Sequence, residues 1–98
     1  MPELEVQTAA GPQRRVLVNA PRLVIGRSEE SDVFLPDSLL SRRHAEIVRE
    51  RAGYRVRDVG SLNGTYINRE RIDEAPLANG DEVQIGKFRL VFYAGQRQ

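Results

Sequence analysis

Apolar residues recur at every second position along much of the chain. The alternation is clearest at 4–6, 54–56, 83–85 and 88–92, where apolar side chains fall on one face of an extended segment and polar neighbours point the other way. Turn-forming clusters of glycine, proline, asparagine and aspartate interrupt the pattern at 11–12, 20–21, 35–37, 52–53, 63–64, 79–81 and 85–87. Many short strands without a long helical pattern predict an all-β fold, an antiparallel β-sandwich or a small barrel.

One segment allows a helix instead. Ser41 is a good N-terminal cap, and residues 42–51 contain several helix formers. Against this, Ala45, Ile47 and Arg49 alternate with their neighbours and lead directly into the turn at Gly53. We therefore predict a strand.

Length and composition narrow the class of protein. With 98 residues, 40% of them hydrophobic, the chain is expected to form one domain over residues 1–98. It has no cysteine, which excludes disulfides and thiolate metal sites, and we expect neither a metal nor a cofactor. The absence of a long apolar run or secretory signal predicts a cytoplasmic protein without membrane contact. The net charge of +1 is too small for non-specific binding to nucleic acid.

Three predicted loops carry polar groups suited to an oxyanion. Gly26-Arg27 follows an apolar strand, the residues from Ser41 to His44 precede the next one, and residues 60–65 read as a hairpin-like turn containing Asn63-Gly64. Together they offer a guanidinium, a hydroxyl, a carboxamide and backbone N–H groups. These are the donors that a phosphate dianion requires.

These motifs, with Asn79-Gly80-Asp81 after them, resemble the signature of forkhead-associated (FHA) domains in order and spacing. The resemblance implies a sandwich of about eleven short strands that binds phosphothreonine at the loops of one end and has no enzyme activity. The expected partner is a phosphothreonine-containing protein, a serine/threonine kinase or its substrate. The stretches 41–46, 58–66 and 77–92 are further similar to a group of actinobacterial regulators of 2-oxoglutarate and glutamate metabolism, which implies a metabolic role. The alternative is an FHA domain from a larger signalling protein with another phosphorylated partner.

The resemblance also implies a role for each loop residue. Arg27 would hold the phosphate or the peptide backbone, Ser41 would donate its hydroxyl to a phosphate oxygen, and Arg42 would add a cation or a backbone N–H. Asn63 would bind the peptide backbone, and Leu62, where many relatives have a hydroxyl, would contribute its backbone alone. Leu39 stands where the family tunes the choice of the third residue after the phosphothreonine.

Three residues are assigned to shaping the loops, namely Gly26, His44 and Gly64. We expect His44, the sole histidine, to hold Ser41 in place by hydrogen bonding within the loop. Taken alone, Arg27 would more simply be a surface arginine paired with Glu29 or Glu30. An isolated Ser41 would be a turn or cap residue.

Other functions compete with phosphopeptide binding. Ser41 and His44 with Asp58 or Asp37 would be a hydrolase triad, although no nucleophile-elbow glycine pattern accompanies them. A group of arginines at 42, 43, 49, 51, 55 and 57 would suit nucleic acid, but acidic residues interrupt it and no aromatic residues stack alongside. A sheet edge would also serve for assembly.

Overall fold

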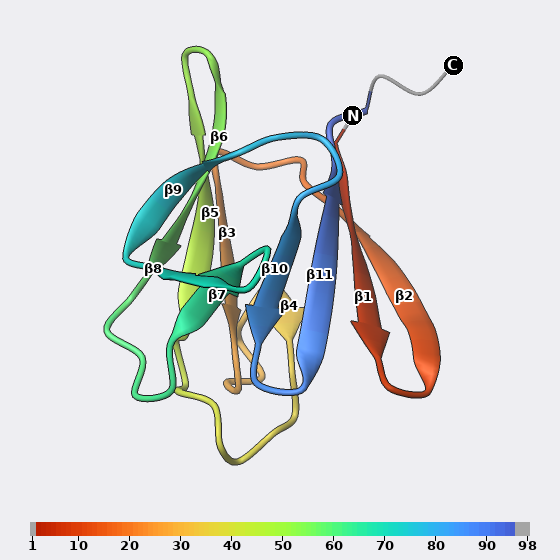
Figure 1. Ribbon diagram of the computed structural model, residues 1–98, viewed down its shortest axis with the longest axis vertical. Coiled ribbons are helices and arrows are strands. Elements are labelled where there is room, and N and C mark those ends of the chain that lie inside the picture. The colour runs from red at the N-terminus through yellow and green to blue at the C-terminus, as the bar shows by residue number, and fades with distance from the viewer. Residues whose placement is uncertain (1, 96–98) are drawn as a thin grey trace.

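The computed structural model describes residues 2–95 as two β-sheets packed face to face (Figure 1). Its eleven strands are β1 (Glu3–Thr8), β2 (Gly11–Leu17), β3 (Arg22–Gly26), β4 (Val33–Phe34), β5 (Ala45–Glu50), β6 (Gly53–Asp58), β7 (Thr65–Ile67), β8 (Glu70–Ile72), β9 (Glu74–Leu77), β10 (Glu82–Ile85) and β11 (Phe88–Tyr93). No helix occurs in this part of the chain, so residues 2–95 contain none long and apolar enough to cross a bilayer. The predicted all-β sandwich is confirmed.

The two sheets have different strand orders. The larger follows the order β2-β1-β11-β10-β7-β8, and the smaller follows β4-β3-β5-β6-β9. Neighbouring strands are antiparallel except β3 and β4, which pair in parallel through Ile25 and Val33. The sequence analysis expected antiparallel strands only. Because β4 has two residues, nothing in its alternation reveals the direction of pairing.

The core lies between the sheets and consists of the residues that alternate inward. Leu4, Val6, Ile25, Ile47, Val56, Val83, Ile85, Leu90 and Phe92 are each at most 1% exposed. Burial of a large apolar side chain contributes roughly 1.5–3 kcal/mol, so this layer supplies much of the stability. It fixes the scaffold from which the loops project.

The segment after Ser41 is a strand, as the alternation predicted. In β5, Ala45 and Ile47 are buried while Glu46 and Val48 are partly exposed, and the strand pairs with β3 on one side and β6 on the other. The helical alternative for residues 41–51 is therefore wrong.

The predicted hairpin-like turn at 60–65 is also wrong. Strand β6 belongs to the smaller sheet and β7 to the larger, so residues 59–64 cross from one sheet to the other instead of closing a hairpin. A two-residue hairpin follows instead between β7 and β8, where Asn68 and Arg69 have φ of 49° and 76°. These left-handed values are those of a type I′ turn, which matches the twist of the flanking strands.

Candidate functional site

The loops after β3, β4 and β6 meet at one end of the sandwich, the lower end in Figure 1. Arg27 directly follows β3, and its backbone N–H donates to the carbonyl of Ser41 at 3.1 Å. Its side-chain Nε donates to the carbonyl of Leu40 at 2.9 Å. The guanidinium is therefore held against the loop after β4, with its terminal nitrogens left for another acceptor.

Arg27 is not paired with the glutamates that follow it. The ion pairs among residues 2–95 include neither Arg27 nor Glu29 nor Glu30. The reading of Arg27 as one half of a surface ion pair is thus not what the structure shows. The positive charge of Arg27 therefore stays available to a ligand at the rim of the loops.

Gly26 allows two loops to touch. A Cβ at this position would lie 2.1 Å from the backbone oxygen of Arg42, well inside van der Waals contact. The close approach lets the N–H of Ser28 donate to that oxygen at 3.2 Å and the N–H of His44 donate to Ile25 at 2.9 Å. Gly26 is needed here for space, since its φ is not among the positive values.

His44 joins the second loop to the third. The imidazole is fully buried, its Nδ1 lies 3.4 Å from the backbone nitrogen of Ser41, and its Nε2 lies 2.9 Å from the carbonyl of Gly64. A backbone N–H only donates, so Nδ1 is the acceptor and the ring proton sits on Nε2, which donates to Gly64. The histidine is neutral in this arrangement and holds the backbone of Ser41, as the sequence analysis expected.

The same contacts weigh against the hydrolase. Both ring nitrogens of His44 face backbone groups, and neither is bonded to the hydroxyl of Ser41. The carboxylate of Asp58 accepts from Ser61 and Thr65. A nucleophile, base and orienting acid are therefore not in line.

Asp58 organises the third loop. Its carboxylate accepts hydrogen bonds from the backbone N–H of Ser61 at 2.8 Å, the Ser61 hydroxyl at 2.5 Å and the Thr65 hydroxyl at 2.7 Å. Burial would raise the pKa of Asp58, but these hydrogen bonds outweigh it and hold the pKa below its usual value. Sequence reasoning missed this role, although Asp is typical of turns, where its carboxylate accepts from nearby backbone N–H groups.

Asn63 completes the assembly from the third loop. Its side-chain Nδ2 donates to the carbonyl of Leu39 at 2.5 Å, so the side chain lies against the loop after β4. Arg27 binds the next carbonyl along, that of Leu40. The structure thus brings Arg27, Ser41 and Asn63 together from three separate loops.

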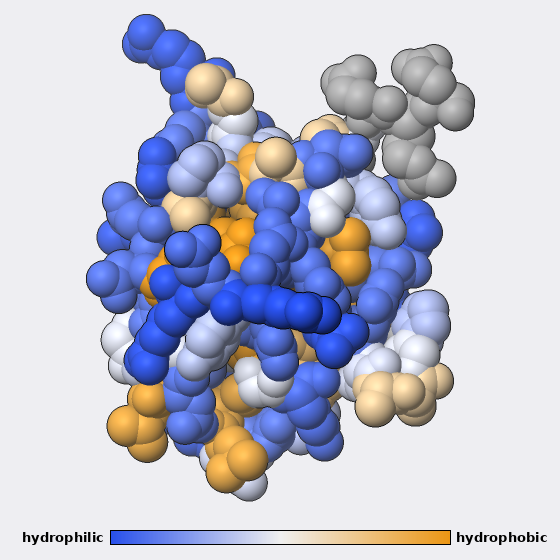
Figure 2. Space-filling model, viewed as in Figure 1, coloured by the Kyte–Doolittle hydropathy of each residue, from blue (hydrophilic) through white to orange (hydrophobic). Residues whose placement is uncertain are grey.

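Arg42 and the two exposed leucines surround this assembly. Arg42 is exposed and, with Arg27, Ser28, Glu29 and Glu30, lines an open cavity of about 310 Å³. Leu39 is 71% exposed and Leu62 is 86% exposed. Figure 2 shows apolar groups at this lower end, set among polar ones. The end therefore combines cations, amide donors and apolar contacts.

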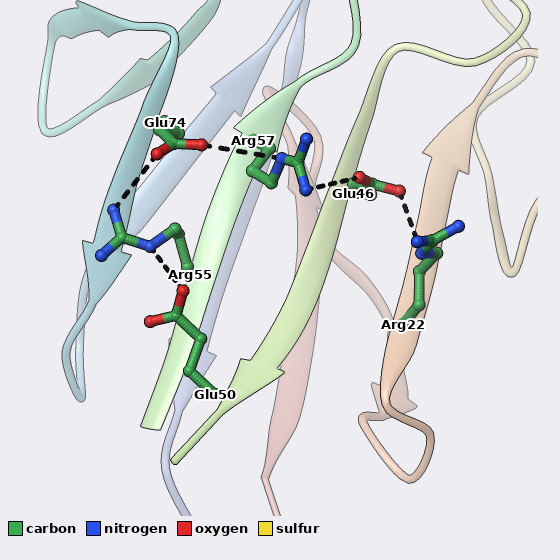
Figure 3. Close-up of polar contacts among 6 residues, drawn as sticks. All are labelled: Arg22, Glu46, Glu50, Arg55, Arg57 and Glu74. Atoms are coloured by element: carbon green, nitrogen blue, oxygen red, sulfur yellow. Dashed lines mark hydrogen bonds and ion pairs between the residues drawn. The ribbon is translucent and has the colours of Figure 1, made fainter. Parts of the chain in front are cut away.

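Two of the six arginines proposed for nucleic acid, Arg55 and Arg57, lie in a row of ion pairs. On the smaller sheet an alternating row of charges crosses strands β3, β5, β6 and β9 (Figure 3). Its ion pairs are Arg22–Glu46 at 3.4 Å, Arg57–Glu46 at 3.7 Å, Arg57–Glu74 at 3.7 Å, Arg55–Glu74 at 3.8 Å and Arg55–Glu50 at 2.8 Å. Each arginine in the row faces a carboxylate, so the face is not a continuous cationic surface of the kind that nucleic acid binders present.

Comparison with known proteins identifies the family to which this fold belongs. A family model described as the FHA domain matches residues 23–86, the span that holds all three loops. The chain belongs to the FHA domain family. Among solved structures, FHA domains superimpose closely. One from an analysis of phosphothreonine-dependent FHA domain interactions has a TM-score of 0.82 at 30% identity and covers 93% of this chain and 95% of its own. The Mycobacterium tuberculosis protein EmbR, in complex with a low affinity phosphopeptide, has a TM-score of 0.87 at 28% identity and covers 98% of this chain and 25% of its own.

Curated relatives of this FHA chain include a regulator and an inhibitor. It is 54% identical over 94 residues to the glycogen accumulation regulator GarA of Mycolicibacterium smegmatis, covering 96% of this chain and 60% of the relative. It is 52% identical over 94 residues to the oxoglutarate dehydrogenase inhibitor of Corynebacterium diphtheriae, covering 96% of this chain and 66% of the relative. The chain thus spans about 60% of the length of the GarA relative. A regulator and an inhibitor fit the expectation that this FHA domain is not an enzyme.

Proposed function

We propose that this FHA domain binds phosphothreonine in partner proteins through the loops after β3, β4 and β6. The observation that carries the proposal is the convergence of Arg27, Ser41 and Asn63 around consecutive carbonyls of residues 39–41. Relatives of the same fold have been solved with a phosphopeptide or studied for phosphothreonine-dependent interactions. The chemistry of the loops and the family therefore support the same ligand.

Each residue has a distinct role in this proposal. Arg27 and Arg42 neutralise the phosphate, and the Ser41 hydroxyl donates to one of its oxygens, each charge-assisted bond contributing roughly 1.5–3 kcal/mol. Asn63 and the backbone of Leu62 hold the peptide chain beside the phosphothreonine. Gly26, His44 and Gly64 shape the loops and do not touch the ligand.

The cavity between the two arginines also contains Glu29 and Glu30. These carboxylates would repel a phosphate placed deep among them, so we place the phosphate at the Ser41 side, where Arg27 is fixed by Leu40. Glu29 and Glu30 would also disfavour additional negative charge on the part of the ligand that lies nearest to them. The site therefore selects one phosphate at a defined position.

A phosphothreonine peptide library screened by calorimetry tests the site. Arg27→Ala and Ser41→Ala are each expected to abolish binding while the thermal midpoint falls by no more than about 8 °C, because both side chains are partly exposed and the hydrogen bond from Arg27 to Leu40 contributes about 1 kcal/mol. Lys87→Ala, in a turn outside the site, is the control and should bind normally. Normal binding by either site variant would show that the phosphate sits elsewhere.

We further propose that the protein containing this chain regulates an enzyme of 2-oxoglutarate metabolism under the control of a serine/threonine kinase. The support is the identity of 52% to an oxoglutarate dehydrogenase inhibitor. Addition of the protein to purified oxoglutarate dehydrogenase is expected to lower its rate in a dose-dependent way. An unchanged rate at saturating protein would remove this enzyme as a target and leave phosphothreonine binding intact.

A further inference from the structure

A second cavity lies beside the start of the loop after β4, and none of its lining residues is Arg27, Ser41 or Asn63. It has a volume of about 640 Å³ and opens between the β1–β2 hairpin, strand β4 and the turn from β10 to β11. Its walls are apolar and include Val6, Phe34, Pro36 and Phe88. It shares no lining residue with the cavity between Arg27 and Arg42. Nothing in the proposed phosphopeptide binding requires this hollow.

Two cations stand at the walls of this cavity. The Arg14 guanidinium donates to the carbonyl of Phe34, which is a neutral partner, and the Lys87 ammonium lies 5.7 Å from the ring centroid of Phe88. Neither cation takes part in the ion pairs found within residues 2–95. No carboxylate lines the cavity, so its charge is positive and unopposed.

The flanking strands disfavour the addition of a peptide strand. β2 is an edge strand with Pro12, which lacks an N–H, with charged Arg14 and Arg15, and with an irregular register beside Val6 and Gln7. Such features are the usual protection of sheet edges against pairing. On the other side β4 has two residues, and the carbonyl of Phe34 already accepts from Arg14. A compact ligand therefore suits the cavity better than an extended segment.

The volume and lining match those of small-molecule sites, which are mostly apolar with a few placed polar groups. We propose that this cavity binds a small free molecule made of one carboxylate on an aromatic or branched apolar body. The apolar body of the ligand lies against Phe34 and Phe88, and its carboxylate binds Arg14 and Lys87. Arg14 then exchanges a carbonyl for a carboxylate, which makes the stronger hydrogen bond.

Phenylbutyrate is a suitable probe of this chemistry, followed by NMR shifts of backbone amides in the whole chain. We expect saturable shifts around Ala9, Ala10 and Lys87 with a Kd of about 1 mM, the strength usual for a ligand of this size. Phenylbutanol lacks the charge and acetate lacks the body, so each is expected to bind about tenfold more weakly. Equal binding of phenylbutanol, or no saturable shift with phenylbutyrate, would overturn the proposal.

Matched variants separate the cavity from general charge effects. Arg14→Gln is expected to weaken phenylbutyrate about tenfold. Arg15→Gln, the next residue on the same strand, should leave the affinity unchanged because Arg15 pairs with Glu3 and Glu5 on the other face. An equal loss in both variants would contradict the assignment.

Two further measurements test whether the ligand is a free small molecule or a protein segment, and whether the probe binds in this cavity or at the phosphate loops. A blocked Asp-Phe-Asp peptide tests a protein segment as the ligand, and if it binds at these amides while phenylbutyrate does not, the small-molecule proposal is wrong. Arg27→Ala is expected to bind phenylbutyrate normally, which keeps this test independent of the phosphothreonine site. Loss of phenylbutyrate binding in Arg27→Ala would show that the probe occupies the phosphate loops.

Discussion

Replacing His44 by alanine tests the link between the loops and the core. The imidazole is fully buried and joins Ser41 to Gly64, so His44→Ala leaves a backbone N–H and a buried carbonyl without their partner. Lost hydrogen bonds of this kind cost about 1–2 kcal/mol each, and the cavity left behind costs about 1–2 kcal/mol more. We expect a total loss of about 3–6 kcal/mol, which is a large part of the stability of a small domain.

Urea unfolding followed by circular dichroism measures this loss, and the thermal midpoint should fall by at least about 12 °C. Phosphopeptide affinity, measured where the variant is still folded, should fall as well because Ser41 is no longer held. His44→Asn is expected to recover about half of the stability, since its amide oxygen reaches the position of Nδ1 but not Gly64. Leu62→Ala, at a site 86% exposed, is the control and should change the free energy of unfolding by less than about 0.5 kcal/mol. A loss under about 1 kcal/mol in His44→Ala would refute the linking role.

Three other changes test local features. Gly26→Ala should destabilise the protein by about 2–3 kcal/mol and weaken phosphopeptide binding, because the added Cβ meets the Arg42 backbone oxygen at 2.1 Å. Urea unfolding measures the change in the free energy of unfolding, and no change would show that the two loops separate freely. Arg69→Gly should raise stability by about 0.5 kcal/mol by relieving the positive φ of 76° at a type I′ turn, measured as the thermal midpoint. The pKa of Asp58 is lowered in the folded state, so the stability that its carboxylate contributes is present above its ordinary pKa and is lost as pH falls through the lower folded value. The free energy of unfolding should therefore drop less between about pH 6 and about pH 2 in Asp58→Asn than in the parent protein.

Much of the fold follows from alternation, but the assignment of strands to sheets does not. Period-two patterns correctly marked the strands at 4–6, 54–56, 83–85 and 88–92, since each has one buried face. The same pattern does not say which sheet a strand joins, so the crossing from β6 to β7 was mistaken for a hairpin. The true hairpin at Asn68 and Arg69 was missed because arginine is an unusual residue for a positive φ.

The candidate site was more predictable than its supports. Arg27, Ser41 and Asn63 were selected because their side chains offer the donors that phosphate needs, in the order typical of one family, and the structure brings them to one end of the sandwich. The carbonyls that position them carry no such signal, because every residue has one. Likewise, Asp58 was considered as a catalytic acid, and its three hydrogen bonds within the third loop emerge from the structure alone.

These supports would help the proposed surface site to be selective. Arg27 and Asn63 are held by the backbone carbonyls of Leu40 and Leu39, so the two side chains are ordered before any ligand arrives and lose less entropy on binding. Because the anchors are backbone atoms, the side chain of Leu39 is not needed for them and stays 71% exposed. A change of the Leu39 side chain would leave the anchor of Asn63 in place and alter what the rim of the proposed site contacts. In the proposed site, the backbone of Leu39 would position Asn63 while its exposed side chain would contact the partner, so partner choice could change while phosphate binding is kept.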